Sequence, residues 1–115
     1  MNIIRFESNG RMSQVVSHGE TLYLAGVVSH CGGDFNAQTE DILNIIDERL
    51  QKYGSDKNHI LSATIYIIDM NKFDYFNEIW DAWIVDGNEP ARTCIVTDFS
   101  TDGIQVEITI TAALK

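Results

Sequence analysis

Hydrophobic residues along this chain recur with two periods, one typical of strands and one typical of helices. Residues 13–18 and 21–28 are β-rich runs on either side of His18-Gly19-Glu20, a pattern that predicts a β-hairpin. In residues 21–28, apolar or small side chains occupy both alternating sets of positions, so we expect a strand that is covered on both faces. A short additional strand is expected near residues 3–6.

Two segments carry apolar residues at helical spacing. The first is expected to begin at a cap formed by Asp34 or Asn36 and to stop at Gly54. Its repeating positions are Ile42, Ile45, Ile46, Arg49, Leu50 and Tyr53. Acidic residues dominate its other face, as is typical of a solvated helix surface.

The second helix is expected to open at Asp69 or Asn71 and to end before Gly87 and Pro90. Its apolar face is mainly aromatic and consists of Phe73, Phe76, Ile79 or Trp80, and Trp83. Such a stripe is more typical of a core than of a cofactor site.

Three more strands complete the predicted order. The β-branched run 60–68 predicts a buried strand, and strands at about 91–97 and 104–112 are joined by a turn at 100–103. The order β-β-α-β-α-β-β contains two β-α-β crossovers, and their common handedness places both helices on one face of a mixed sheet. We therefore expect an α+β fold, a two-layer α/β sandwich, with a single domain over residues 1–115.

A two-layer sandwich leaves one sheet face without helices. In the last strand one alternating set is apolar and fits beneath the helices, namely Ile104, Val106, Ile108 and Ile110. The other set is polar with one charge, namely Gln105, Glu107, Thr109 and Thr111. We expect Ile65 and Ile67 to join this second face, which is then too apolar for solvent and too polar for a core. It predicts a closed homo-oligomer with clefts at the subunit boundaries.

Charge and composition narrow the class of partner. Eight basic and 17 acidic residues give a formal net charge of −9, which disfavours nucleic acid and anionic membrane surfaces as partners. The two cysteines cannot form a disulfide framework. No signal peptide or spanning segment is evident, so we expect a cytoplasmic protein.

Arg92 is the most informative charged residue. It lies at the entry of a strand, directly after the Pro90-Ala91 pair. A guanidinium at that position can hold a carboxylate through two parallel hydrogen bonds, which a lysine cannot do. A structural ion pair with a nearby Asp or Glu is the alternative interpretation.

Glu107 is the acid within the final strand, and it belongs to the face without helices. A carboxylate there could position a water molecule or accept a proton. The alternatives are an ion pair across a subunit boundary and a structural partnership with Arg92 itself.

Other candidate groups are weaker. Cys94 shares the Arg92 side of its strand, but no histidine is near in sequence, so a packed thiol is favoured over a nucleophile. The loop His30-Cys31-Gly32-Gly33-Asp34 offers possible metal ligands without a second ligand pair, and we expect no metal there. His18 and His59 are interpreted as turn and helix-end residues. No phosphate-binding glycine loop or catalytic triad motif is present, and no cofactor is expected.

Several segments in a specific order resemble the RidA (YjgF) reactive-intermediate deaminases, which are also known as L-PSP endoribonuclease-like proteins. The similarity runs almost end to end and is greatest to the YoaB-like branch. It rests on Ser13-Gln14-Val15-Val16, Gly19, Leu22 to Gly26, Gln38-Thr39, Ile68-Asp69, Phe73 to Asn77, Trp80-Asp81-Ala82-Trp83, Pro90-Ala91-Arg92 and Val106-Glu107-Ile108.

The resemblance implies a chorismate-mutase-like fold, a homotrimer and a cleft at each subunit boundary. It implies hydrolysis of reactive 2-imino acids, such as 2-aminoacrylate, to 2-keto acids and ammonia. By this similarity Arg92 holds the substrate carboxylate, Glu107 positions the attacking water, and backbone groups at Gly26 and Cys94 complete the pocket. Such chemistry requires positioning and local electrostatics rather than a metal or a covalent nucleophile.

Two positions depart from the family pattern. Many deaminating members have a tyrosine in place of Met12 and a serine in place of Ala25, so this pocket lacks two hydroxyl groups and is more apolar. The substrate could accordingly be larger and more hydrophobic, or turnover slower. Two other functions stay open at this stage, a non-catalytic trimer that binds small carboxylates and regulates a partner, and a ribonuclease, against which the acidic balance counts.

Overall fold

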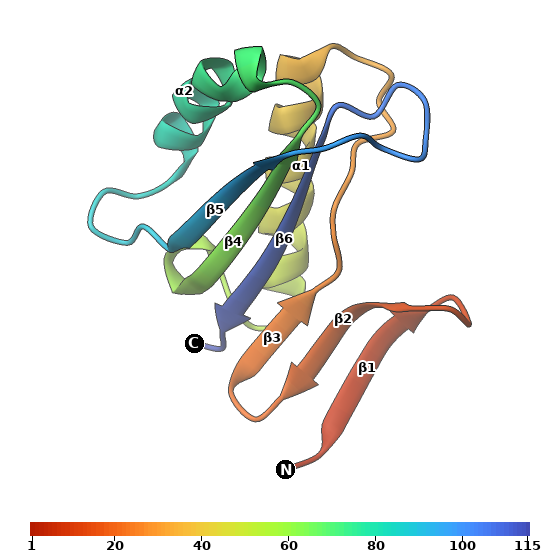
Figure 1. Cartoon of the computed structure of the whole chain (residues 1–115). Helices are drawn as coiled ribbons and strands as arrows, with labels where there is room; N and C mark the ends of the chain where they lie inside the picture. Colours follow the sequence, from red (N-terminus) through yellow and green to blue (C-terminus); the bar gives the residue numbers. More distant parts are fainter.

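The computed structural model describes residues 1–115 as a mixed sheet with two helices (Figure 1). The strands are β1 (Ile3–Ser8), β2 (Ser13–His18), β3 (Thr21–Leu24), β4 (Ile60–Ile67), β5 (Ala91–Val96) and β6 (Val106–Ala113). The helices are α1 (Phe35–Lys52) and α2 (Phe73–Trp83), and the 3₁₀ turns are η1 (Lys57–His59) and η2 (Met70–Lys72).

The six strands form one sheet in the order β1-β2-β3-β6-β4-β5. All neighbours are antiparallel except β4 and β5, which are parallel. Figure 1 shows both helices on the same side of the β6-β4-β5 half, while the β1-β2 hairpin extends away from them. The predicted mixed sheet with two helices on one face is confirmed.

The helix boundaries follow from local capping. Asp34 accepts a hydrogen bond from the Ala37 amide at 2.9 Å and so caps α1. At the other end Gly54 adopts φ +91°, a conformation that favours glycine after a helix. The predicted start of the second helix at Asp69 or Asn71 is wrong, because Asp69 instead caps η2 through the Asn71 amide at 2.8 Å, and α2 begins at Phe73.

One hydrophobic core lies between the sheet and the helices. Val106, Ile108 and Ile110 of β6 are buried in it as predicted, and the alternation continues to the buried Ala112. The placement of Ile65 and Ile67 on the other face is wrong. Both side chains are fully buried, because their register opposite Ile108 and Val106 places them on the helix side of the sheet.

The expected strand 21–28 is shorter than predicted. It ends at Leu24. Tyr23 pairs with Thr111 and Val27 with Ile108, so the segment after β3 holds one residue more than the facing part of β6 and forms a bulge. Within it the Ala25 amide donates to Gln14 O at 2.9 Å. Cover on both faces is also wrong for this strand, since Tyr23 is 47% exposed.

The sheet face opposite the helices, here called the open face, carries partly exposed residues from four strands. By register its members are Tyr23, Ser62, Thr64, Tyr66, Thr93, Ile95, Glu107, Thr109 and Thr111. The mixture of hydroxyl groups, tyrosines and an isoleucine agrees with the predicted character of this face. Neither helix of the chain is long and apolar enough to cross a membrane.

Candidate functional site

Arg92 faces the helices and lies beneath the aromatic side of α2. Its register opposite Ala63 places it on the helix side of the edge strand β5. The guanidinium carbon is 5.7–6.0 Å from three ring centroids, those of Phe73, Phe76 and Trp80. These distances allow cation–π attraction to all three rings.

No acid neutralises this guanidinium within the chain. The carboxylates that form ion pairs are Glu7 and Asp56, and neither pairs with Arg92. The alternative of a structural ion pair at Arg92 is therefore not realised within one subunit. A half-buried cation without a counter-ion is a site that favours an anionic ligand.

A cavity of about 320 Å³ opens beside Arg92. Apart from Arg92 itself, its walls are apolar or weakly polar and consist of Ile67, Met70, Phe73, Cys94 and Val96. A ligand held here meets one charged group and an apolar surface.

Cys94 belongs to this cavity as a packing residue. Burial raises the pKa of its thiol above the ordinary value of 9.0, and the Arg92 charge opposes that rise only in part. The thiol is therefore protonated at neutral pH and a poor nucleophile.

The main chain at Cys94 offers a hydrogen-bond donor. Thr97 N donates to Ile67 O at 3.0 Å, so the Thr97 amide points toward β4. Successive amides along a strand point in opposite directions, and Cys94 is three residues before Thr97. The Cys94 amide therefore points away from β4, at the free edge of β5.

Glu107 lies on the open face, opposite Tyr66 in the register. Its carboxylate packs directly against the main chain of Gly26: a Cβ built on Gly26 would lie 2.0 Å from Glu107 Oε2. Any larger residue at this position would displace the Glu107 carboxylate, so glycine permits this close approach. The Gly26 amide donates to no protein acceptor, so a free N–H and a free carboxylate lie side by side.

A second cavity, of about 290 Å³, is lined by Glu107 and by loop residues. The other lining residues are Val28, His30, Tyr66, Thr97, Asp98, Phe99, Ser100, Thr101 and Ile104. This cavity contains the potential base, whereas the Arg92 cavity contains the anion-binding group.

Four of the six predicted site residues therefore fall into two pairs on opposite sides of the sheet. Arg92 and Cys94 lie on the helix side of β5, whereas Glu107 and Gly26 meet at the open face. This separation excludes the alternative that Glu107 is the structural partner of Arg92 within one chain. Ala25 lies in the bulge after β3, and Met12 lies in the β1–β2 turn with 40% exposure, at the far end of the sheet from β5.

Asn77, Tyr66 and the 97–101 loop have no site role predicted from the sequence, and His30 is interpreted there only as a possible metal ligand. Asn77 directly follows Phe76 in α2, and its buried Oδ1 accepts no hydrogen bond, which is unusual for a buried amide. His30, Tyr66 and the 97–101 loop line the Glu107 cavity. These residues are recognised only because the folded chain brings them close to Glu107, and no sequence motif indicates that proximity.

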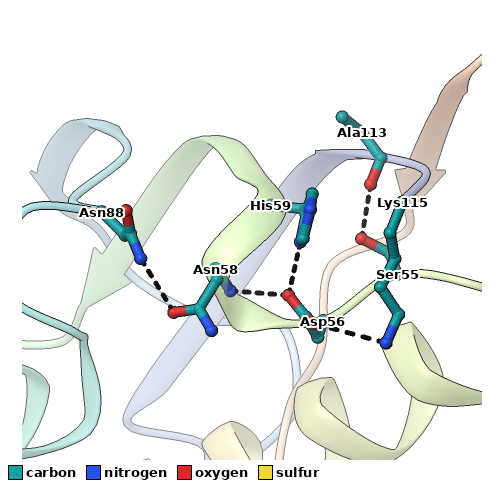
Figure 2. Close-up of polar contacts among 7 residues, drawn as sticks. All are labelled: Ser55, Asp56, Asn58, His59, Asn88, Ala113 and Lys115. Carbon is teal, nitrogen blue, oxygen red and sulfur yellow. Dashed lines mark hydrogen bonds and ion pairs between the residues drawn. The ribbon is translucent and has the colours of Figure 1, made fainter.

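A separate polar cluster at the C-terminus is structural (Figure 2). His59 Nδ1 is 2.6 Å from Asp56 Oδ1, and Lys115 Nζ is 3.5 Å from Asp56 Oδ2. The His59 hydrogen bond is the main reason that the pKa of Asp56 lies below its usual range. The nearby Ser55 hydroxyl donates to Ala113 O at 2.5 Å, so it is not aligned with His59 as a nucleophile.

The loop at His30 and Cys31 leaves the Cys31 side chain exposed. No three His, Cys, Asp or Glu side chains of the chain converge in a way that could hold a metal ion.

Comparison with known proteins identifies the class. Residues 3–114 match the family model described as Endoribonuclease L-PSP. The chain is 41% identical to the RutC family protein YoaB of Escherichia coli K12 over 99% of its own length and all of that protein. It is 35% identical to a RutC family protein of Haemophilus influenzae, with 97% and 98% of the two chains covered.

Solved structures agree. NMB1025 of Neisseria meningitidis, a member of the YjgF family, superposes with a TM-score of 0.95 at 39% identity, covering 100% of this chain and 97% of that one. YyfA of Yersinia pestis, from the conserved Rid family, superposes with a TM-score of 0.86 at 26% identity, covering 93% and 90%.

The fold and the two-part site thus define a small α+β protein of the YjgF type. The chain belongs to the L-PSP endoribonuclease-like family, which includes the RutC and YjgF proteins. The predicted family membership is confirmed.

Proposed function

We propose that this protein is an enamine/imine deaminase that hydrolyses 2-imino acids to 2-keto acids and ammonia. The observation that carries the proposal is the unpaired Arg92 guanidinium beside a ligand-sized cavity. A carboxylate would supply the anion that Arg92 lacks in the chain, and the outward amide of Cys94 would add a second donor.

The reaction needs a water molecule and a group to orient it. Glu107 is suited to this role because its carboxylate forms no ion pair within the chain and packs against Gly26. The water oxygen forms a bond to the imine carbon as Glu107 accepts its proton. That proton passes to the nitrogen and gives a carbinolamine. The hydroxyl proton of the carbinolamine is then transferred to the nitrogen, again through Glu107, as the C–N bond breaks, so that a carbonyl group forms and ammonia leaves. Water and the imino acid account for all atoms of the products, and no metal or cofactor is required by the balance.

Arg92 and Glu107 can act on one substrate only if two subunits contribute. The free edge of β5 carries the Arg92 cavity, and the open face carries Glu107. Contact between two different surfaces of identical chains forms a ring when the rotation between neighbours closes, and an open filament when it does not. We propose a homotrimer in which the β5 edge of one subunit meets the open face of the next, so that each boundary forms one active site in a cytoplasmic enzyme.

The second candidate is a non-catalytic trimer that binds small carboxylates in the same clefts. It is favoured by the absence of hydroxyl groups at Met12 and Ala25, which leaves fewer groups to hold a substrate in a reactive pose. A ribonuclease, which the family description suggests, is disfavoured by the net charge of −9, because an acidic chain repels a phosphate backbone.

A coupled assay distinguishes these functions. A serine or threonine dehydratase, or an L-amino-acid oxidase with catalase, generates the imine in the cuvette, and keto-acid release is followed. Wild type is expected to accelerate release, and both Arg92→Ala and Glu107→Gln are expected to abolish the acceleration. If wild type never exceeds spontaneous hydrolysis, yet binds keto acids in a manner lost in Arg92→Ala, the binding trimer is correct and the deaminase is not.

A further inference from the structure

We propose that the site selects imino acids with bulky apolar side chains, of the size of the leucine, methionine or phenylalanine side chain, over 2-aminoacrylate and other small imines. This inference rests on the proposed function and adds the class of substrate. It is carried by the walls of the Arg92 cavity.

The cavity is larger than a small imine requires. Its volume of about 320 Å³ would hold about ten water molecules at roughly 30 Å³ each. A substrate fixed through its carboxylate at Arg92 and bearing only a methylene group would leave most of that space to water. A branched or aromatic side chain would occupy more of it and remove apolar surface from water.

The chemistry of the walls points the same way. Beyond Arg92, the lining offers aliphatic groups, a methionine, an aromatic ring and a protonated thiol. None of these groups is a strong hydrogen-bond donor or acceptor, so a hydroxylated or charged substrate side chain would lose its hydration without compensation. A site of this kind discriminates by size and apolarity.

Two wall residues are exposed in the single chain and lie outside the core. Because Val96 belongs to the β5 edge that is proposed to meet the next subunit, the oligomeric state of each variant is checked before its kinetics are compared. Val96 is 43% exposed at the end of β5, and Met70 is 66% exposed in η2. Both line the cavity, and neither belongs to the buried core cluster. Val96→Thr preserves shape while adding a hydroxyl group, and Met70→Gln preserves length while adding an amide.

The test compares kcat/KM for imines generated from leucine and from alanine by an L-amino-acid oxidase. The leucine side chain removes three more carbon atoms from water than the alanine side chain, so we expect wild type to prefer the leucine imine by at least tenfold even with partial burial. Val96→Thr and Met70→Gln should each lower this ratio several-fold. Val85→Thr is the matched control, because Val85 is 38% exposed but lies outside the cavity, and its ratio should equal that of wild type.

The outcomes separate this inference from the proposed function. Turnover of both imines without a preference for the leucine imine would overturn the inference and leave the deaminase intact. Turnover of neither imine would overturn the deaminase. In that case binding of 4-methyl-2-oxopentanoate and pyruvate, measured by calorimetry, decides the inference: tighter binding of the branched keto acid, weakened by Val96→Thr, supports the apolar selectivity, and equal binding refutes it.

Discussion

Gly26→Ala is expected to damage catalysis while leaving substrate binding and folding largely intact. The new Cβ would lie 2.0 Å from Glu107 Oε2, whereas ordinary contacts begin at 3.4 Å, so the carboxylate must move by 3.4 − 2.0 = 1.4 Å. A misplacement of about 1 Å in a catalytic group can cost roughly 10²-fold in rate. The backbone of Gly26 is not in the left-handed region, so alanine itself introduces no conformational strain there.

The magnitude and its origin can be separated by kinetics. We expect kcat to fall about 100-fold, equivalent to about 2.7 kcal/mol, with little change in KM, because the carboxylate of the substrate is held by Arg92 and not by Glu107. The assay is single-substrate turnover of an in situ imine. Folding is checked by urea denaturation, where overpacking that a flexible side chain can relieve should cost about 1 kcal/mol.

A double-mutant cycle tests whether the loss acts through Glu107. Because Glu107→Ala is itself expected to be inactive, the cycle is measured in the free energy of unfolding: in the Glu107→Ala background Gly26→Ala should cost no stability, since no carboxylate remains to be displaced. An equal loss in both backgrounds would show that Gly26 acts through another group. A wild-type kcat in the single variant would refute the close approach as a catalytic requirement.

Three other predictions concern charge and reactivity. Arg92→Met should abolish turnover yet leave the free energy of unfolding within about 1 kcal/mol of wild type, because no buried partner charge is orphaned; a large loss in urea denaturation would show a structural ion pair instead. The pKa of Asp56 is depressed from 3.8 by the His59 hydrogen bond, so its stabilisation is present above that pH and is lost as the pH falls below it. Asp56→Asn should therefore be less stable than wild type at pH 7, and the difference should shrink as the pH falls below 3.8; a difference that stays constant in acid would contradict this assignment. Cys94→Ser should retain most activity, and the native thiol should react with iodoacetamide more slowly at pH 8 than a free thiol, since burial raises its pKa.

Most of the fold follows from local pattern. The two helices are evident from apolar spacing and from Asp34 and Gly54 at the ends of α1, because capping depends on neighbours in the chain. The alternation in the last strand also predicts its two faces. The orientation of the 60–68 run was not predictable, because nearly every position in it is apolar or small and only the register with β6 decides which side chains are buried.

The functional site is harder to predict from the sequence than the fold. Ala25-Gly26 resembles a continuing strand, and the bulge arises from hydrogen bonds to Gln14 and from the pairing of Val27 with Ile108, which are tertiary contacts. The contact between Gly26 and Glu107 joins the segment after β3 to strand β6, and no local sequence pattern indicates it. The family resemblance predicts that Arg92 and Glu107 serve one site, which the periodicity of the sequence does not predict. That the two side chains lie on opposite sides of the sheet is evident only from the folded chain.

The central claim is that each active site combines Arg92 of one subunit with Glu107 of another. Its most direct test is complementation between Arg92→Ala and Glu107→Gln, each expected to be inactive alone. The two variants are unfolded, mixed in equal amounts and refolded together, and keto-acid release is measured. With random assembly, about one quarter of the boundaries should carry both native side chains, so about one quarter of wild-type activity should return. If the mixture stays inactive while wild type refolded in the same way is active, Arg92 and Glu107 do not share a site between subunits.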